Sequence, residues 1–154
     1  SGTITPSEAY GCCHDQANMN IKGKSKMQCS CIDFDGNDAV GLYKNDTLID
    51  MIGQLGNTPG NSGWQIGSGF TKDYTLVRGA DVRQGTPYWS IAQMEYQVLP
   101  MDDSDSLGNH NGYCKTTKAT VRFVKFFKSS SNFIQSPILG ISPYDGAFYH
   151  FFIV

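Results

Sequence analysis

The sequence predicts an all-β protein built from antiparallel strands. The clearest signal lies in residues 33–52, where a polar turn at residues 35–38 precedes a first strand at residues 39–44. Asn45 and Asp46 then turn the chain into a second strand at residues 47–52. Short β-prone runs bounded by Gly, Asn and Asp are typical of hairpins. The 17 glycines and 6 prolines also suit a loop-rich β protein.

The other strands are expected wherever β-branched and aromatic residues gather between turn residues. These runs lie at residues 3–5, 10–13, 74–78, 96–99, 121–127 and 148–154. Residues 19–25 are expected to form one or two helical turns. Residues 53–72 form a long connection rich in Gly, Asn and Ser, with Trp64 in its middle. We therefore divide the chain into a β domain at residues 1–114 and a strand-forming tail at residues 115–154.

Composition favours one folded domain and excludes two classes of partner. The chain has 154 residues, of which 40% are hydrophobic and 17% are charged, which is enough for a single core. A net charge of −2 offers no clustered basic face for nucleic acid. No apolar run approaches the roughly 20 residues that span a bilayer. No signal peptide is visible, so we expect either a mature, cleaved chain or a cytosolic one.

Several segments occur in the order found in a known family: residues 34–44, residues 48–56, Trp64, residues 75–78 and residues 107–110, with upstream matches at residues 1–4, 8–10 and 13–17. Together they resemble the extracellular members of the lamin tail domain family. The resemblance implies an immunoglobulin-like antiparallel β-sandwich over about residues 1–110. The chain departs from the family in two places. The family's opening strands are missing before Ser1, and residues 114–154 have no counterpart.

The five cysteines are Cys12, Cys13, Cys29, Cys31 and Cys114. Adjacent residues of a strand face opposite sides, while Cys29 and Cys31 share a side. We expect a disulfide between Cys13 and Cys29, a pairing that the family resemblance also implies, and Cys114 can then pair with Cys12 or Cys31. One cysteine remains as a thiol or as a link to another chain. Disulfides predict secretion into an oxidising compartment. The alternative is a zinc site, for which the spacing of these residues is poor.

Two further features suit an extracellular protein. Asn45 begins an Asn-Asp-Thr sequon in the predicted hairpin turn, which makes it a glycosylation candidate. Asp33, Asp35 and Asn37 alternate as calcium ligands do, but the loop is not an EF-hand, because Asp38 occupies its glycine position. Asp and Asn also bond to their own backbone in turns. We therefore predict no cofactor and keep calcium as an alternative.

Aromatic residues in the loops offer a candidate ligand surface. Trp64, Tyr88 and Trp89 are flat or amphipathic rings that stack well on the C–H faces of sugars, and packing in the core is the competing explanation. We predict no catalytic residues, because the three histidines lack a nucleophile elbow of the Gly-x-Ser-x-Gly type.

The tail is strongly β-prone and ends in a segment without charge. A segment like this would aggregate if it were uncovered, and the domain lacks its family's opening strands. We therefore expect tail strands to fill the vacant positions, either in the same chain or in a neighbouring one. The residues assigned to this packing are Val121, Phe123, Phe127, Phe148, Phe151, Phe152 and Val154.

Together these features predict a secreted, non-enzymatic structural or assembly protein that self-associates. It would form an open filament if strands are exchanged head to tail between subunits. One alternative is a carbohydrate- or surface-binding adhesion module. Another is an accessory domain of a secreted nuclease or other hydrolase.

Overall fold

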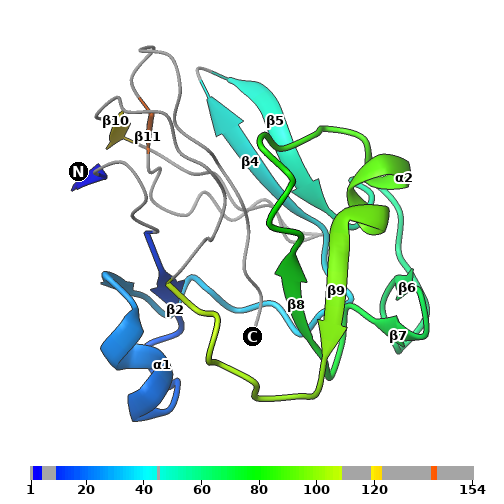
Figure 1. Cartoon of the computed structure of the whole chain (residues 1–154), viewed down its shortest axis with the longest axis horizontal. Coiled ribbons are helices and arrows are strands. Elements are labelled where there is room, and N and C mark those ends of the chain that lie inside the picture. The colour runs from blue at the N-terminus through cyan, green and yellow to red at the C-terminus, as the bar shows by residue number, and fades with distance from the viewer. Residues whose placement is uncertain (1, 5–9, 45, 109–118, 123–139, 142–154) are drawn as a thin grey trace.

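The computed structural model describes residues 2–4, 10–44, 46–108, 119–122 and 140–141, and β structure predominates there (Figure 1). The strands are β1 (Gly2–Ile4), β2 (Cys12–Cys13), β3 (Met27–Gln28), β4 (Val40–Lys44), β5 (Thr47–Ile52), β6 (Gln65–Ile66), β7 (Gly69–Phe70), β8 (Thr75–Arg78), β9 (Tyr96–Leu99), β10 (Ala119–Arg122) and β11 (Gly140–Ile141). The helices are α1 (Met19–Lys24), α2 (Trp89–Ala92) and the 3₁₀ helix η1 (Gln93–Glu95).

The predicted central hairpin is confirmed. β4 and β5 pair antiparallel from Val40↔Ile52 to Lys44↔Thr47, with a register shift after Leu42. Asp46 lies in the connecting turn with a φ of 61°, a left-handed conformation that Asp tolerates better than most residues. The local turn chemistry therefore determines this element, as the sequence indicated.

The described strands form several small sheets, and they do not establish a sandwich. β8 pairs with β9, β6 pairs with β7, and β4 pairs with β5, all antiparallel. β2 and β3 form a parallel pair of two residues each. The helix α1 is confirmed within the predicted residues 19–25, and it supplies the crossover that a parallel connection requires. The predicted boundary at residue 114 lies outside the described residues.

The core lies between the β4–β5 hairpin, the paired strands β8 and β9, and the helix α2. Figure 1 shows α2 beside the end of β5, with β8 and β9 below it. The side chains that form the core are Val40, Met51, Ile52, Ile66, Leu76, Trp89, Ala92 and Tyr96. Gly53 permits the close approach of Trp64, because a Cβ at this position would overlap the indole ring. All of these residues belong to the segment 40–96.

The described tail strands pair with the N-terminus of the same chain. β10 lies between β1 and β11, and all three strands are antiparallel to their neighbours. Val121 is opposite Gly2 on one side and Ile141 on the other. The tail thus supplies two strands to a sheet that begins at residue 2, which is one of the two arrangements that the sequence left open.

Candidate functional site

The cysteine ribbon, which we define as β2, β3 and the turn at residues 29–31, holds one disulfide and two thiols. Its parallel register pairs Cys12 with Met27 and Cys13 with Gln28. The N–H of Cys29 donates to the carbonyl oxygen of Cys13 at 3.0 Å, so the two chains continue side by side into the turn. Four of the five cysteines therefore lie within one small supersecondary unit.

The disulfide in this ribbon joins Cys29 to Cys31, and the predicted Cys13–Cys29 pairing is wrong. The Cα atoms of Cys29 and Cys31 are 5.1 Å apart, within the usual range for a disulfide. Cys13 is opposite Gln28 rather than Cys29, so strand alternation directs its Cβ away from the side that Cys29 occupies. β3 ends at Gln28, and the turn that follows brings Cys29 and Cys31 close enough to form the bridge.

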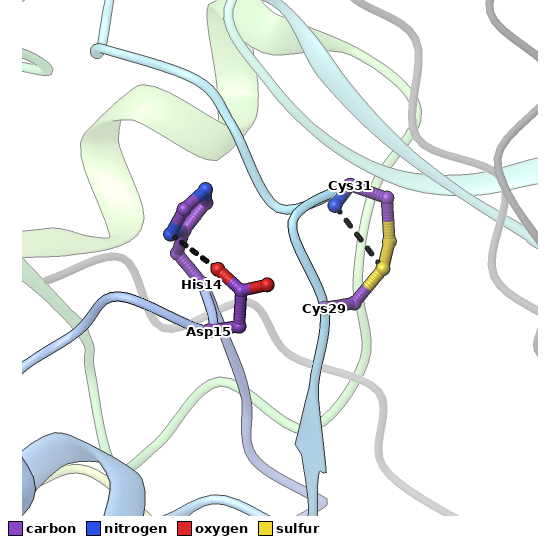
Figure 2. The surroundings of a disulfide bond; sticks show 4 residues. All are labelled: His14, Asp15, Cys29 and Cys31. Atoms are coloured by element: carbon purple, nitrogen blue, oxygen red, sulfur yellow. Dashed lines mark hydrogen bonds and ion pairs between the residues drawn. A yellow bond between two sulfur atoms is a disulfide. The ribbon is translucent and has the colours of Figure 1, made fainter.

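The bridge lies at a partly accessible place with a defined polar environment (Figure 2). Both of its cysteines are half-buried. The N–H of Cys31 donates to Cys29 Sγ at 3.1 Å, and the N–H of Ile32 donates to the Cys29 carbonyl oxygen at 3.1 Å. Figure 2 shows His14 and Asp15 in the same surroundings, with His14 Nδ1 3.2 Å from Asp15 Oδ1.

Cys12 and Cys13 are thiols rather than members of the disulfide. Cys13 is only 5% exposed. Burial, reinforced by the neighbouring Cys13, raises the pKa of the Cys12 thiol to about 11. Because the thiolate is both the nucleophile and the metal ligand, Cys12 stays largely inactive near pH 7. Cys114 lies outside the described residues.

The metal hypotheses gain no support from the part of the chain that the structure describes. In that part, no group of three or more His, Cys, Asp or Glu side chains is arranged to hold an ion. The calcium candidates form a turn instead, in which the N–H of Asn37 donates to Asp35 Oδ1 at 3.4 Å. Asp35 also lies 3.5 Å from Lys72 Nζ, and Asp33 is exposed.

A second polar cluster, which sequence reasoning missed, lies inside the core. The Arg78 guanidinium donates from Nη1 to Asp50 Oδ2 at 2.7 Å and to the Tyr96 hydroxyl at 3.1 Å. Its Nε donates to Glu95 Oε2 at 2.9 Å, and Nη2 contacts the same oxygen. Asp50 Oδ1 accepts the N–H of Thr86 at 3.1 Å. We call these residues the charged core, which joins β5, β8, β9, η1 and the loop before α2.

Burial dominates the electrostatics of this charged core. The side chains of Asp50 and Arg78 are both fully buried. Burial raises the pKa of Asp50, against the opposing influence of the Arg78 charge. Burial also raises the pKa of Tyr96, which keeps its hydroxyl neutral. Because every charged group has an opposite charge or a donor beside it, the arrangement suits a structural tie between strands.

The predicted aromatic platform is not assembled as expected. Trp89 is 8% exposed and belongs to the core. Trp64 is half-buried and packs edge-on against Trp89, with ring centroids 6.3 Å apart and planes at 70°. Tyr88 alone of the three is exposed, at 64%. The two tryptophans therefore pin the loop at residues 53–72 to the core, which was the competing explanation for Trp64.

Tyr88 instead begins an apolar strip along α2 and η1. Ile91 and Met94 follow it at intervals of three residues and are 45% and 77% exposed. A pocket of about 410 Å³ lies beside Met94. The residues that line this pocket are Ile66, Gly67, Ser68, Gln93, Met94, Tyr96 and Val98.

The remaining predicted site residues are only partly placed. Val121 lies in β10, between β1 and β11. The glycosylation candidate Asn45 lies outside the described residues. The same is true of the tail residues Phe123, Phe127, Phe148, Phe151, Phe152 and Val154.

Comparisons of this chain with protein-family models, curated proteins and solved structures give no match. The resemblance to the lamin tail domain therefore stays a prediction from its motifs. Within the described residues, no helix has the length and apolar character to cross a membrane.

Proposed function

We propose that this protein is a non-enzymatic structural and assembly module of the extracellular space. In this proposal it is a lamin-tail-like, immunoglobulin-like sandwich that its own C-terminal strands complete. The observation that carries the proposal is the pairing of β10 with β1, because it joins residues more than 110 positions apart in the sequence.

The β1–β10 contact is a strand addition that another molecule can also make. It consists of three residue pairs, Gly2↔Val121, Thr3↔Thr120 and Ile4↔Ala119. Main-chain hydrogen bonds form equally well within a chain and between chains, so one subunit can supply β10 to the β1 of the next. Such a contact is head to tail, and it extends into a filament unless the rotation between subunits closes a ring.

The cysteine ribbon supports the extracellular location. A disulfide between Cys29 and Cys31 persists in an oxidising compartment and is rare in the reducing cytosol. This support is independent of the tail strands.

The test compares assembly in the wild-type protein and in Thr120→Pro, which removes a backbone donor from β10. Molecular mass is measured by size-exclusion chromatography with light scattering over a range of protein concentrations. We expect the wild-type mass to exceed that of the monomer and to rise with concentration, and Thr120→Pro to lower it. Gln84→Pro, at an exposed loop position, is the matched control and leaves assembly unchanged.

Two outcomes contradict the assembly proposal. One is a wild-type protein that stays monomeric at every concentration. The other is a folded Thr120→Pro variant that assembles like the wild type. Circular dichroism of each variant shows whether the fold is retained.

A second candidate function, adhesion to a glycan or another surface, is favoured by the exposed apolar strip of Tyr88, Ile91 and Met94. An exposed tyrosine can stack on a sugar while its hydroxyl remains solvated. Glycan-array binding that Tyr88→Ser abolishes and Tyr88→Phe retains would support this function. Glycan binding that both variants retain would place the binding site away from Tyr88.

A further inference from the structure

The Cys29–Cys31 bridge is poorly suited to be a structural crosslink. It joins two residues of one turn, so it connects no two distant segments of the chain. The entropy that a disulfide removes from the unfolded chain grows with the length of the closed loop, and this loop is among the shortest possible. Cys12 and Cys13 remain thiols on the neighbouring strand, although a longer-range link there would restrict the chain more. A different role has to account for this pairing.

The environment leaves the bridge intact until a thiol arrives from outside. Both bridged cysteines are half-buried, whereas Cys13 is buried. Cys12 holds its proton at neutral pH because of its raised pKa. Since only a thiolate attacks a disulfide, Cys12 does not consume the bridge at neutral pH. Cys13 lies opposite Gln28, so its Cβ points away from the side that Cys29 occupies.

The hydrogen bonding identifies the leaving sulfur. Cys29 Sγ accepts the N–H of Cys31 at 3.1 Å. A hydrogen bond to a sulfur stabilises its thiolate more than its disulfide form, because the thiolate carries the full negative charge. A more stable thiolate leaves faster in thiol–disulfide exchange. Attack is therefore directed to Cys31 Sγ, with Cys29 as the leaving group.

We propose that the Cys29–Cys31 bridge is a redox-active disulfide that oxidises one dithiol per protein molecule, in a stoichiometric exchange rather than an enzymatic turnover. The first thiolate of the dithiol attacks Cys31 Sγ, the Cys29–Cys31 bond breaks, and Cys29 leaves as a thiolate. The second thiolate then attacks the sulfur of the dithiol in the mixed disulfide and releases Cys31. The dithiol loses two electrons and two protons and becomes a disulfide, while Cys29 and Cys31 gain both and become thiols.

The first experiment tests whether the bridge exchanges in the folded protein. The oxidised protein is mixed anaerobically with an equimolar dithiol probe, dithiothreitol, at neutral pH. The reaction is quenched with acid, alkylated and mapped by peptide mass spectrometry. We expect Cys29 and Cys31 to become alkylated, one equivalent of oxidised dithiothreitol to form, and the circular dichroism spectrum to stay unchanged. A bridge that survives in the folded protein, or that opens only as the spectrum is lost, would overturn the proposal.

The second experiment tests the direction of attack with a monothiol, reduced glutathione, at a limiting concentration. We expect the trapped mixed disulfide on Cys31 to exceed that on Cys29 by roughly tenfold, since the better leaving group departs first. Cys29→Ser, treated with oxidised glutathione, is expected to hold the mixed disulfide on Cys31. Cys12→Ser is the matched control and exchanges like the wild type. Equal labelling of the two positions, or a preference for Cys29, would contradict the assigned direction.

Discussion

In the cysteine ribbon the bridged residues Cys29 and Cys31 are half-buried, whereas in the charged core the side chains of Asp50 and Arg78 are fully buried. The ribbon has a covalent bond, but the bond is local to a single turn. The charged core contains no disulfide, yet its ion pairs and hydrogen bonds connect Arg78 to Asp50, Glu95 and Tyr96. Among the described residues the long-range ties are therefore noncovalent, whereas the disulfide is confined to one turn. Substitutions in the two regions test this division.

The largest effect is expected from Asp50→Ala in the charged core. This substitution leaves the Arg78 charge buried without its 2.7 Å partner, and losing one partner of a buried pair costs about 3–5 kcal/mol. Urea unfolding followed by circular dichroism measures the change in the free energy of unfolding. Asp81→Ala, at an exposed position, is the control and is expected to stay within about 0.5 kcal/mol of wild type.

A double variant separates lost burial from lost charge. Asp50→Leu combined with Arg78→Met removes both charges and keeps apolar volume, so its cost is expected to fall well below that of Asp50→Ala. If the double variant is less stable than Asp50→Ala, the ion pair itself makes a large contribution to the free energy of unfolding.

Whether the sequence could predict a part of this structure depends on how far apart in the chain the contacting residues lie, as the β4–β5 hairpin and the charged core show. The β4–β5 hairpin was predictable because its turn residues and both of its β-prone runs lie within 20 consecutive positions. The Asp50–Arg78 pair was not, because each residue looks like an ordinary charge in a β-prone run. A charged residue between apolar strand residues, such as Arg78 after Leu76 and Val77, was the available signal.

Long-range contacts also explain why the predicted Cys13–Cys29 disulfide is wrong and why the sequence left the burial of Trp89 open. Pairing Cys13 with Cys29 assumed a favourable alignment of two segments, and only the parallel register fixed by the α1 crossover shows that Cys13 lies opposite Gln28. For Trp89 the sequence left a ligand surface and core packing open, and α2 has four residues, too few for helical periodicity to decide between them. Its burial follows from tertiary packing against β5 and Trp64.

The next effect is a pH dependence that originates in the ribbon. Cys12 has a pKa raised from 9.0 to about 11, so the folded state binds its proton more tightly than the unfolded chain does. Its contribution to stability is therefore constant below pH 9 and is lost as the pH rises through about 11, by up to roughly 2–3 kcal/mol. The measurement is the difference in unfolding free energy between wild type and Cys12→Ser from pH 7 to pH 11. A difference that does not change with pH would mean that Cys12 is less enclosed than described.

A smaller effect is expected when the bridge is removed. Cys29→Ser combined with Cys31→Ser opens only a short loop, for which the entropy model gives roughly 1–2 kcal/mol. This is below the cost of Asp50→Ala, and the same unfolding measurement compares the two. A loss as large as that of Asp50→Ala would show that the bridge is a structural tie after all, and would reverse the division between the two regions.

The smallest effect concerns the helix that sets the register of the ribbon. Asn18 caps α1, since its Oδ1 accepts the N–H of Ile21 at 3.0 Å. Asn18→Ala is expected to cost about 1 kcal/mol, because it leaves that donor without its side-chain partner. Amide hydrogen exchange of Ile21 measures the effect as a roughly fivefold loss of protection. Asn18→Asp retains an acceptor and is expected to retain protection, and Asn20→Ala controls for a polar change within the helix. Since α1 is the crossover between β2 and β3, protection lost at Cys29 as well as at Ile21 would show that the cap controls the alignment on which the bridge depends.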